Sequence, residues 1–291
     1  MVGMSQIPRV GIVFRPQLPP ERLAGFAAAA EDAGLDDLWL WEDCFLEGGL
    51  TTATAVLAWS SSLRVGLGLM PVPLRNPALA AMEIATLARL FPGRFVPAFG
   101  HGVQSWMAQV GAAAASPLGL LREWVSAVRA LLAGDTVTAA GRYVTLDRVA
   151  LDWPPPARVP VLIGGRGPKT LALAGELADG LVLDAGTAPD AVSRALARAA
   201  APGPAEVVVY LPCGTGPGSA ERIQAELPPS APPAAAAGLA AGGSAAEVAR
   251  AIRAFAAAGA TTVVLQPAGD DPDVAAVIEL AGAARVQLRA G

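Results

Sequence analysis

The sequence is poor in cysteine and histidine. Its 291 residues include 2 cysteines and 1 histidine, and the cysteines, Cys44 and Cys213, lie far apart in the chain. Neither belongs to a CxxC pair or to a Cys/His cluster with the spacing of a zinc site. These absences argue against a disulfide framework and against a bound structural metal.

Long apolar runs and basic clusters are also missing. Glycine, proline or a charged residue interrupts every apolar stretch well before about 18 residues, the length that a membrane-spanning helix needs. The N-terminus lacks a basic segment followed by an apolar core, so we expect a cytoplasmic protein with no membrane partner. The net charge is -4 and the basic residues are scattered singly, which argues against nucleic acid as a partner.

What the sequence does contain is a repeated alternation of two kinds of segment. Short runs rich in Val, Leu, Ile and Phe alternate with alanine-rich amphipathic stretches, a pattern typical of βα units around a parallel sheet. Strands are predicted at Val10–Phe14, Leu38–Glu42, Val65–Leu69, Phe95–Phe99, Val161–Gly164, Gly180–Leu183, Glu206–Leu211 and Thr262–Gln266. Eight such units predict one α/β domain over residues 1–291, a (β/α)8 TIM barrel.

The segments between these strands are predicted to be helices. Their expected ranges are Pro20–Ala33, Thr51–Trp59, Pro77–Leu90, Pro117–Ala133, Pro168–Ala178, Pro189–Ala200, Ala245–Ala258 and Asp273–Ala284. Several begin at a proline, which favours the first helical position. Gly34 and Gly259 each follow a helix and precede a strand, as expected for a C-terminal cap with positive φ.

Two segments interrupt the alternation. Thr136–Leu151 reads as two strands around Ala140-Gly141, which predicts a hairpin inserted after the fourth helix. Pro212–Gly243, after the seventh strand, is rich in Pro, Gly and Ala, so we expect a mobile loop over the active face. Part of it, Ala220–Leu227, is a candidate for a short helix.

Polar residues follow the second and fourth predicted strands, at the end where barrel enzymes carry catalytic groups. Side chains alternate along a strand, so one of Glu42 and Asp43 should point into the barrel mouth. His101 lies between Gly100 and Gly102, which leave room for a planar ligand, and it could exchange a proton near neutral pH. Equally, the histidine could be only a hydrogen-bonded loop residue, and the aspartate only a helix cap or an ion-pair partner.

The turn Gly164-Gly165-Arg166-Gly167-Pro168-Lys169 opens the fifth predicted βα helix. Free N–H groups and the helix dipole attract an anion at such a position, and Arg166 and Lys169 add positive charge. The turn therefore predicts a phosphate site, although it matches neither GxxxxGK[ST] nor a GxGxxG after a first strand. Glycines in such a turn also serve simply to make it tight.

An ordered set of motifs runs through the region from Val10 to Leu183. The set comprises Leu38-Trp39-Leu40-Trp41-Glu42-Asp43, Val65-Gly66-Leu67-Gly68, Arg75-Asn76-Pro77, Ala85-Thr86-Leu87, Pro92-Gly93-Arg94-Phe95, Gly165-Arg166-Gly167-Pro168 and Leu173-Ala174-Gly175-Glu176-Leu177-Ala178-Asp179-Gly180. In this order the motifs resemble the luciferase-like family of flavin- or deazaflavin-dependent oxidoreductases. The pattern is most similar to the branch that uses coenzyme F420, a deazaflavin, and that includes methylenetetrahydromethanopterin reductases.

The resemblance implies a flavin or deazaflavin ring held over the C-terminal ends of the strands. It also implies a cis peptide bond between two non-proline residues of the third strand, expected here at Leu67–Gly68. Trp106 is expected to form a wall of the pocket. The expected coenzyme contacts are Asp43, Leu67, Gly68, Gly100, His101, Gly102, Trp106, Gly164, Gly165, Arg166, Gly167, Lys169 and Asp184.

The sequence departs from the family pattern at two places. The family often has Asp-His after the second strand, where this chain has Asp43-Cys44, and several deazaflavin enzymes carry an acid where this chain has Val103 and Gln104. The remaining proton-transfer candidates are His101, Asp43, Glu42 and Cys44, with His101 as the leading acid or base.

The function that the resemblance implies is hydride transfer between reduced F420 and a small organic substrate, with reduction of a C=C, C=N or C=O bond. One alternative is an FMN-dependent monooxygenase of the same fold. A second is a barrel that has lost catalysis and serves as a binding subunit. The substrate is not indicated by the sequence, and surplus apolar surface predicts a homodimer.

Overall fold

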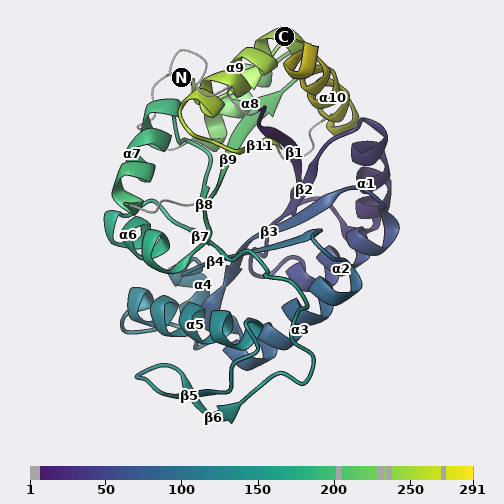
Figure 1. Cartoon of the computed structure of the whole chain (residues 1–291). Coiled ribbons are helices and arrows are strands. Elements are labelled where there is room, and N and C mark those ends of the chain that lie inside the picture. Colours follow the sequence, from purple (N-terminus) through teal and green to yellow (C-terminus); the bar gives the residue numbers. More distant parts are fainter. Residues whose placement is uncertain (1–6, 201–204, 228–232, 234–237, 270–272, 291) are drawn as a thin grey trace, which may run out of the picture.

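Eight parallel strands form a closed ring at the centre of the molecule (Figure 1). The computed structural model describes residues 7–200, 205–227, 233, 238–269 and 273–290. The strands are β1 (Arg9–Phe14), β2 (Asp37–Leu40), β3 (Arg64–Pro71), β4 (Phe95–Gly100), β7 (Leu162–Gly164), β8 (Gly180–Leu183), β9 (Glu206–Gly214) and β11 (Thr262–Pro267). Pairing of β11 with β1 and of β8 with β9 closes the ring, so the predicted barrel is confirmed.

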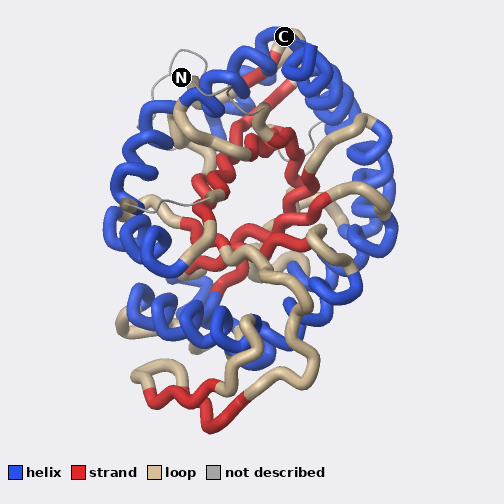
Figure 2. The backbone as a smooth tube through the Cα atoms, in the orientation of Figure 1, coloured by secondary structure: helices blue, strands red, loops and turns tan. Residues whose placement is uncertain are grey.

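Helices surround the ring on all sides (Figure 2). They are α1 (Leu23–Asp32), α2 (Gly49–Trp59), α3 (Pro77–Leu90), α5 (Pro117–Leu132), α6 (Pro168–Leu177), α7 (Pro189–Ala199), α9 (Ala245–Ala257) and α10 (Val274–Ala290). The first turn predicted for α1 is a separate 3-10 turn, η1 (Pro20–Arg22), and a second such turn, η2 (Val72–Leu74), follows β3. None of the helices formed by the described residues is long and apolar enough to cross a membrane.

The two predicted interruptions have different outcomes. The hairpin is confirmed as β5 (Val137–Ala140) paired antiparallel with β6 (Thr145–Val149). The segment expected to be a loop contains the end of β9, the helix α8 (Ser219–Glu226) and the short strand β10 (Ala241–Gly242), which pairs with β9. The short helix expected there is thus confirmed. Residues 228–232 and 234–237 lie outside the described residues, and the mobility of this segment stays a prediction.

The interior of the ring is filled with side chains around one large indole. Trp39 is fully buried, and a Cβ on Gly66 would lie 2.3 Å from its ring, so β3 can pass the indole only with a glycine there. The other buried members of this inner cluster are Val13, Val96, Ala98, Leu162, Val182, Val208, Tyr210 and Val264. The ring is therefore a packed core below its C-terminal mouth.

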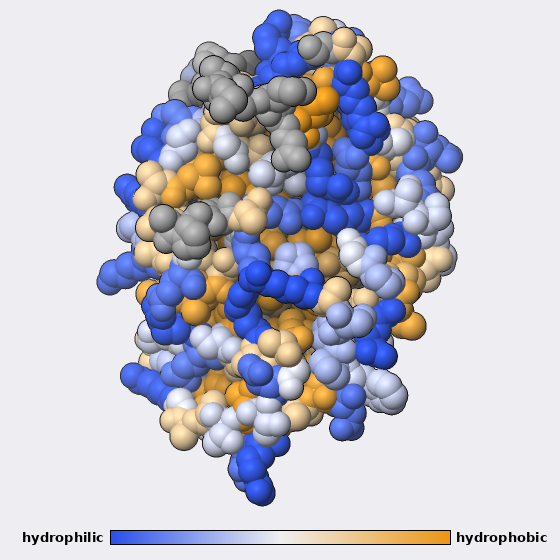
Figure 3. All heavy atoms as spheres, in the orientation of Figure 1, coloured by the Kyte–Doolittle hydropathy of each residue, from blue (hydrophilic) through white to orange (hydrophobic). Residues whose placement is uncertain are grey.

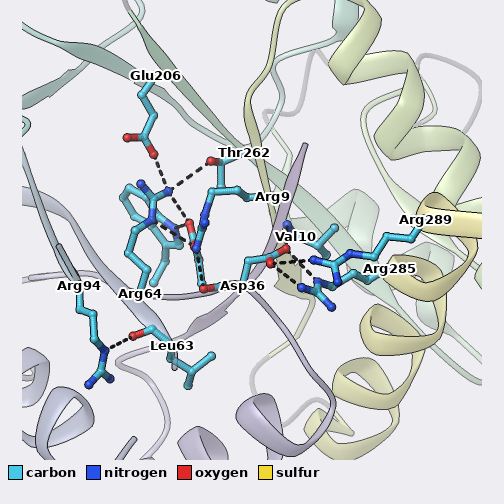
Figure 4. A network of polar contacts seen from close by, with 12 residues as sticks. Arg9, Val10, Asp36, Leu63, Arg64, Arg94, Glu206, Thr262, Arg285 and Arg289 are labelled. Carbon is cyan, nitrogen blue, oxygen red and sulfur yellow. Dashed lines mark hydrogen bonds and ion pairs between the residues drawn. The ribbon is translucent and has the colours of Figure 1, made fainter. Parts of the chain in front are cut away.

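The N-terminal end of the ring is closed by ion pairs (Figure 4). Asp37 at the start of β2 is 0% exposed and accepts hydrogen bonds from Arg9 Nε at 2.7 Å and Arg64 Nη2 at 2.7 Å. Arg64 also contacts Glu206 at the start of β9, at 2.5 Å across the ring. On the side shown in Figure 3, hydrophilic residues lie over the middle of the ring. Charged side chains that bridge β1, β2, β3 and β9 thus seal this end.

A second set of ion pairs at the same end holds α10 against the barrel. Asp36 accepts hydrogen bonds from Arg285 at 2.9 and 2.6 Å and from the backbone N–H of Val10 at 2.9 Å. Burial alone would raise the pKa of Asp36, but the bonds from Arg285 and Val10 outweigh it and lower the pKa. The carboxylate therefore stays ionised and ties the last helix to β1.

Candidate active site

A cavity of about 490 Å³ opens at the C-terminal ends of the strands, a volume typical of small-molecule sites. The predicted residues that line it are Glu42, Asp43, Gly68, His101, Gly102, Trp106, Gly164, Gly165, Arg166 and Asp184. Five other predicted site residues do not line it: Cys44, Leu67, Gly100, Gly167 and Lys169. The cavity thus collects most of the residues expected from the strand ends.

The floor of the cavity is a bulge in β3. The predicted cis peptide bond between Leu67 and Gly68 is wrong by one residue, because the cis bond joins Gly68 and Leu69. The register with β4 shifts between Gly68 and Met70, so Gly68 and Leu69 both face the cavity. Leu67 lies before the bulge, points outward and packs in the core between strands and helices, so it is not a cavity residue. A second non-proline cis bond joins Cys44 and Phe45.

Neighbouring glycines leave the space that Leu69 occupies. A Cβ on Gly164 would lie 2.4 Å from the Leu69 side chain, and a Cβ on Gly100 would lie 2.6 Å from it. Gly100 therefore accommodates Leu69 and does not itself line the cavity. Leu69 and these glycines therefore form an apolar floor to the cavity.

Tyr210 on β9 supports this floor and was missed by the sequence analysis. Its hydroxyl donates a hydrogen bond to the Gly68 carbonyl at 3.1 Å, and its ring stands edge-on to Trp39 and Trp41, with centroids 6.0 and 5.6 Å away. Burial raises the pKa of Tyr210, so the hydroxyl stays a neutral donor. Tyr210 is one of 2 tyrosines and faces inward near a predicted strand end, so the rule that found Asp43 could have found it.

Glu42 and Asp43 both line the cavity, although alternation along the chain predicted that only one would, and their environments differ. Glu42 is buried and accepts two hydrogen bonds from Arg75, at 2.5 and 2.6 Å, and one from the Gly49 N–H at 3.1 Å. The half-buried carboxyl of Asp43 accepts no hydrogen bond from the residues that the structure describes. Burial raises the pKa of Asp43, and the positive charge of Arg15 partly opposes that shift. Asp43 is thus the cavity carboxyl available for proton exchange.

His101 lines the cavity, but one of its two ring nitrogens is already bonded. Nε2 lies 3.0 Å from the Thr170 hydroxyl on α6, and Nδ1 is buried without a normal hydrogen bond to any described residue. Burial lowers the pKa of His101, and the nearby Pro117 backbone offsets only part of that effect. The imidazole is therefore a neutral ring fixed against α6, and its bonded Nε2 does not support direct proton donation to a ligand.

The glycine-rich turn forms one wall of the cavity. The helix α6 begins at Pro168 without a side-chain cap on its first turn. Arg166 reaches across to the next strand end, with Nε 2.6 Å from Asp184 and Nη2 2.8 Å from the Ala185 carbonyl. Lys169 is exposed and does not line the cavity. The predicted phosphate site therefore has one arginine near it, already paired with Asp184, and it stays a prediction.

A buried polar network closes the side of the mouth next to β1 and β11. Arg15, just after β1, forms an ion pair with Glu226 of α8 and donates hydrogen bonds to the carbonyls of Pro267 at 3.0 Å and Gly269 at 2.9 Å. Glu226 also accepts from Gln266 Nε2 at 2.7 Å and from the Gly269 N–H at 2.8 Å. Glu226 and Gln266 line the cavity, so this network holds α8 over the mouth.

Cysteine and metal chemistry have no support at this site. Burial raises the pKa of the Cys44 thiol, the neighbouring carboxylates raise it further, and the side chain does not line the cavity. Cys213 is buried, and burial raises its pKa to about 12. Within the described part of the chain, no group of three or more His, Cys, Asp or Glu side chains is placed to hold a metal ion.

A closed parallel barrel with a ligand-sized cavity at its strand ends defines the class of TIM-barrel proteins with a small-molecule site. The chain belongs to the luciferase-like monooxygenase family, whose family profile matches residues 5–227. The family resemblance seen in the sequence is thereby confirmed.

Two curated relatives are named as a reductase and a dehydrogenase. Over 175 residues the chain is 31% identical to the 5,10-methylenetetrahydromethanopterin reductase of Methanolobus tindarius, a match covering 60% of this chain and 53% of that protein. It is 33% identical over 190 residues to an F420-dependent glucose-6-phosphate dehydrogenase of Nakamurella multipartita, covering 60% of this chain and 55% of that protein. The chain thus matches about half the length of these relatives.

Solved structures share the fold over nearly the whole chain. The F420-dependent tetrahydromethanopterin reductase of Methanopyrus kandleri has a TM-score of 0.79 at 21% identity and covers 95% of this chain and 98% of its own. A monooxygenase of Streptomyces bottropensis has a TM-score of 0.81 at 21% identity and covers 94% of this chain and 97% of its own. At these identities the structures support the barrel and leave the reaction open.

Proposed function

We propose that this protein is an oxidoreductase that uses coenzyme F420 to reduce a small organic substrate. The observation that carries the proposal is the apolar floor made by Gly68 and Leu69, set in a cavity at the strand ends of a luciferase-like barrel. The names of the reductase and dehydrogenase relatives support F420 as the coenzyme. When bound, F420 would supply or accept a hydride, which a protein side chain cannot do.

The residues of the cavity fit a planar ring system. Gly68 and Gly164 leave the floor open, and Leu69 and Val182 give it apolar contact surface. Trp41 and Trp106 provide aromatic walls. Apolar surfaces with a few fixed polar groups are typical of coenzyme sites, because the apolar area binds the ring and the polar groups orient it.

We assign the proton-exchange role to Asp43, in place of His101. Its carboxyl lines the cavity and has no competing hydrogen bond within the described structure, whereas both oxygens of Glu42 are held by Arg75. Because burial raises its pKa, Asp43 holds a proton to higher pH than an exposed aspartate does. Such a shift favours a side chain that donates a proton to a substrate atom as the hydride arrives.

The test is the substitution Asp43→Asn, which keeps the shape of the side chain and removes its acidic proton. We expect turnover to fall about a hundredfold or more, in line with the usual contribution of general acid catalysis, while F420 affinity changes less than about threefold. The matched substitution Cys44→Ser, at the neighbouring position outside the cavity, should leave turnover within about twofold. An Asp43→Asn protein with wild-type turnover over the whole pH range would exclude this role.

An FMN-dependent monooxygenase is the second candidate. The family description and the monooxygenase from Streptomyces bottropensis favour it, and the same apolar floor would accept either ring. A barrel without catalysis is the third, because Cys44 stands where the family often has histidine. Oxygen consumption with FMN and a reductant, compared with oxidation of reduced F420, separates the two enzymes, and inactivity in both assays points to the third.

A homodimer also stays a proposal. Large apolar side chains are exposed on two adjacent helices of the barrel, with Leu79 and Met82 on α3 and Trp59 at the end of α2. Such groups are commonly buried when two copies associate. Sedimentation equilibrium of the purified protein measures the mass directly, and a monomer at all concentrations would exclude the dimer. The cytoplasmic location stays a prediction as well.

A further inference from the structure

Gln266 is a polar residue of the cavity for which the proposed function has no role. It lies near the end of β11, its side chain lines the cavity, and the residue is only 6% exposed. Buried amides are retained in proteins where each polar atom has a partner or faces a ligand. The partners of its two amide atoms therefore indicate what it does.

The orientation of this amide is set by its neighbour Glu226. A carboxylate only accepts hydrogen bonds, so the NH2 group of Gln266 must face it, as the 2.7 Å contact from Nε2 to Glu226 Oε2 shows. Glu226 also forms an ion pair with Arg15 and accepts a hydrogen bond from the N–H of Gly269. A flipped amide would set its oxygen against the Glu226 carboxylate, so the flip is excluded by repulsion.

The carbonyl oxygen of Gln266 is consequently left for the cavity. Among the described residues none donates a hydrogen bond to Oε1, and this oxygen is not one of the buried atoms that lack a partner. It is therefore an accessible acceptor with a fixed direction. The carboxyl of Asp43 is the second cavity acceptor without a partner in the described structure.

These two acceptors lie on one side of the barrel. Gln266 belongs to β11 and Asp43 follows β2, and the order of strands around the ring places β1 between them. In a ring of eight strands β7 stands opposite β1, so the turn that carries Arg166 faces the acceptors across the cavity. Because Arg166 is already bonded to Asp184 and to the Ala185 carbonyl, the two acceptors without partners lie together on the side opposite to it.

We propose that Gln266 is a positioning residue whose carbonyl oxygen accepts a hydrogen bond from an N–H or O–H group of the bound ligand. The inference rests on the proposed function and deepens it, because it fixes which edge of the ligand faces β1. The donor has two possible sources with the same chemistry. One is the N–H between two carbonyls in the pyrimidine ring of a flavin or deazaflavin, and the other is an N–H or O–H group of the substrate.

The first experiment is Gln266→Met, which keeps the length of the side chain and removes both amide groups. F420 affinity is measured by equilibrium titration. The kcat and the KM for the substrate are measured with the reduced coenzyme. We expect F420 affinity to fall about tenfold if the coenzyme is the donor, or KM to rise about tenfold if the substrate is, which is the value of one hydrogen bond to a buried acceptor. Gln287→Met, an exposed glutamine on α10, is the matched control and should change neither.

A second experiment separates positioning from a structural role. Methylating the ring N–H of the coenzyme should weaken its binding to the wild type and have no further effect on Gln266→Met, if that N–H is the donor. In Glu226→Gln the amide of Gln266 is free to flip, so the methylated ring should be tolerated better than by the wild type. If the substitutions only loosened the packing, binding of the methylated and of the unmethylated coenzyme would be weakened equally in both variants.

The outcomes are distinct from a failure of the proposed function. If the wild type binds neither F420 nor FMN, the proposed function fails before Gln266 is tested. If the wild type binds and turns over, and Gln266→Met retains both F420 affinity and KM within about twofold, the positioning role is overturned.

Discussion

The two ends of the barrel carry the same kinds of polar side chain, but these are paired at one end, whereas two acceptors at the other have no partner in the described structure. At the N-terminal end, Asp37 is enclosed by two arginines, and one of these, Arg64, reaches on to Glu206. At the C-terminal end, Asp43 and the carbonyl of Gln266 face a cavity without partners in the described structure. Paired charges make a stable closure, whereas unpaired acceptors beside an apolar floor make a site that a ligand can complete.

The largest expected effect is at the closed end. Asp37→Asn removes the carboxylate that neutralises Arg9 and Arg64, and breaking a buried ion pair costs about 3 kcal/mol or more of unfolding free energy. Urea denaturation measures this loss. Asp147→Asn, whose side chain is 83% exposed beside Arg148, is the control and should change stability by less than about 0.5 kcal/mol.

The same variant also tests the separation of the two ends. Below its melting temperature, Asp37→Asn should bind coenzyme as the wild type does, because the ion pairs and the cavity lie at opposite ends of the strands. A loss of coenzyme affinity in a folded Asp37→Asn protein would contradict the comparison.

The next effect is at the open end. Gly164→Ala places a Cβ 2.4 Å from the Leu69 side chain, so Leu69 must move into the cavity. We expect coenzyme affinity to fall at least about tenfold, with a stability change of about 1 kcal/mol or less because Leu69 can move into open space. Gly25→Ala on α1, where a Cβ meets no atom within 4 Å, is the control. Unchanged affinity in Gly164→Ala would show that the ring does not lie on this floor.

The smallest effect concerns pH and Glu47, in the loop between β2 and α2. Burial, with a contribution from Glu21, raises the pKa of Glu47 from 4.5 to about 7. Between those values the folded protein binds more protons than the unfolded chain, so stability falls as pH rises through this window. Glu47→Gln should remove this fall. Above about pH 7 it should be the more stable protein by about 1 kcal/mol or less, because the partly exposed side chain is screened by solvent.

The pH dependence is checked by thermal melts of both proteins across the window. At pH values below 4.5 the two should melt alike, since Glu47 is then protonated in both states. If the difference in melting temperature between the wild type and Glu47→Gln stays constant across the window, the raised pKa of Glu47 is contradicted.

Periodicity and strand-end position predicted much of this molecule. The alternation of apolar strands and alanine-rich helices predicted all eight barrel strands. The alternation of side chains predicted that one of Glu42 and Asp43 points into the mouth, whereas both line the cavity. The cis bond was misplaced by one residue because a bulge changes which side chains face inward, and a bulge leaves no mark in a run such as Val65–Leu69.

Contacts between segments that are far apart in the chain could not be predicted from the sequence. His101 looked like a free acid or base, but its Nε2 pairs with Thr170, which is 69 residues away in the chain. Glu226 reaches the cavity only because α8 folds back over β1 and β11. Tyr210 and Gln266 could have been predicted as site residues, since both lie at predicted strand ends, where barrel enzymes carry catalytic groups.

The most direct test of the account is an equilibrium titration of the purified protein with F420 and, separately, with FMN. The account predicts saturable binding of F420 that is tighter than binding of FMN, is weakened by Gly164→Ala and is unchanged by Asp37→Asn. Tight FMN binding with no F420 binding would contradict the proposed coenzyme. An F420 affinity that is unchanged by Gly164→Ala would contradict the proposed site.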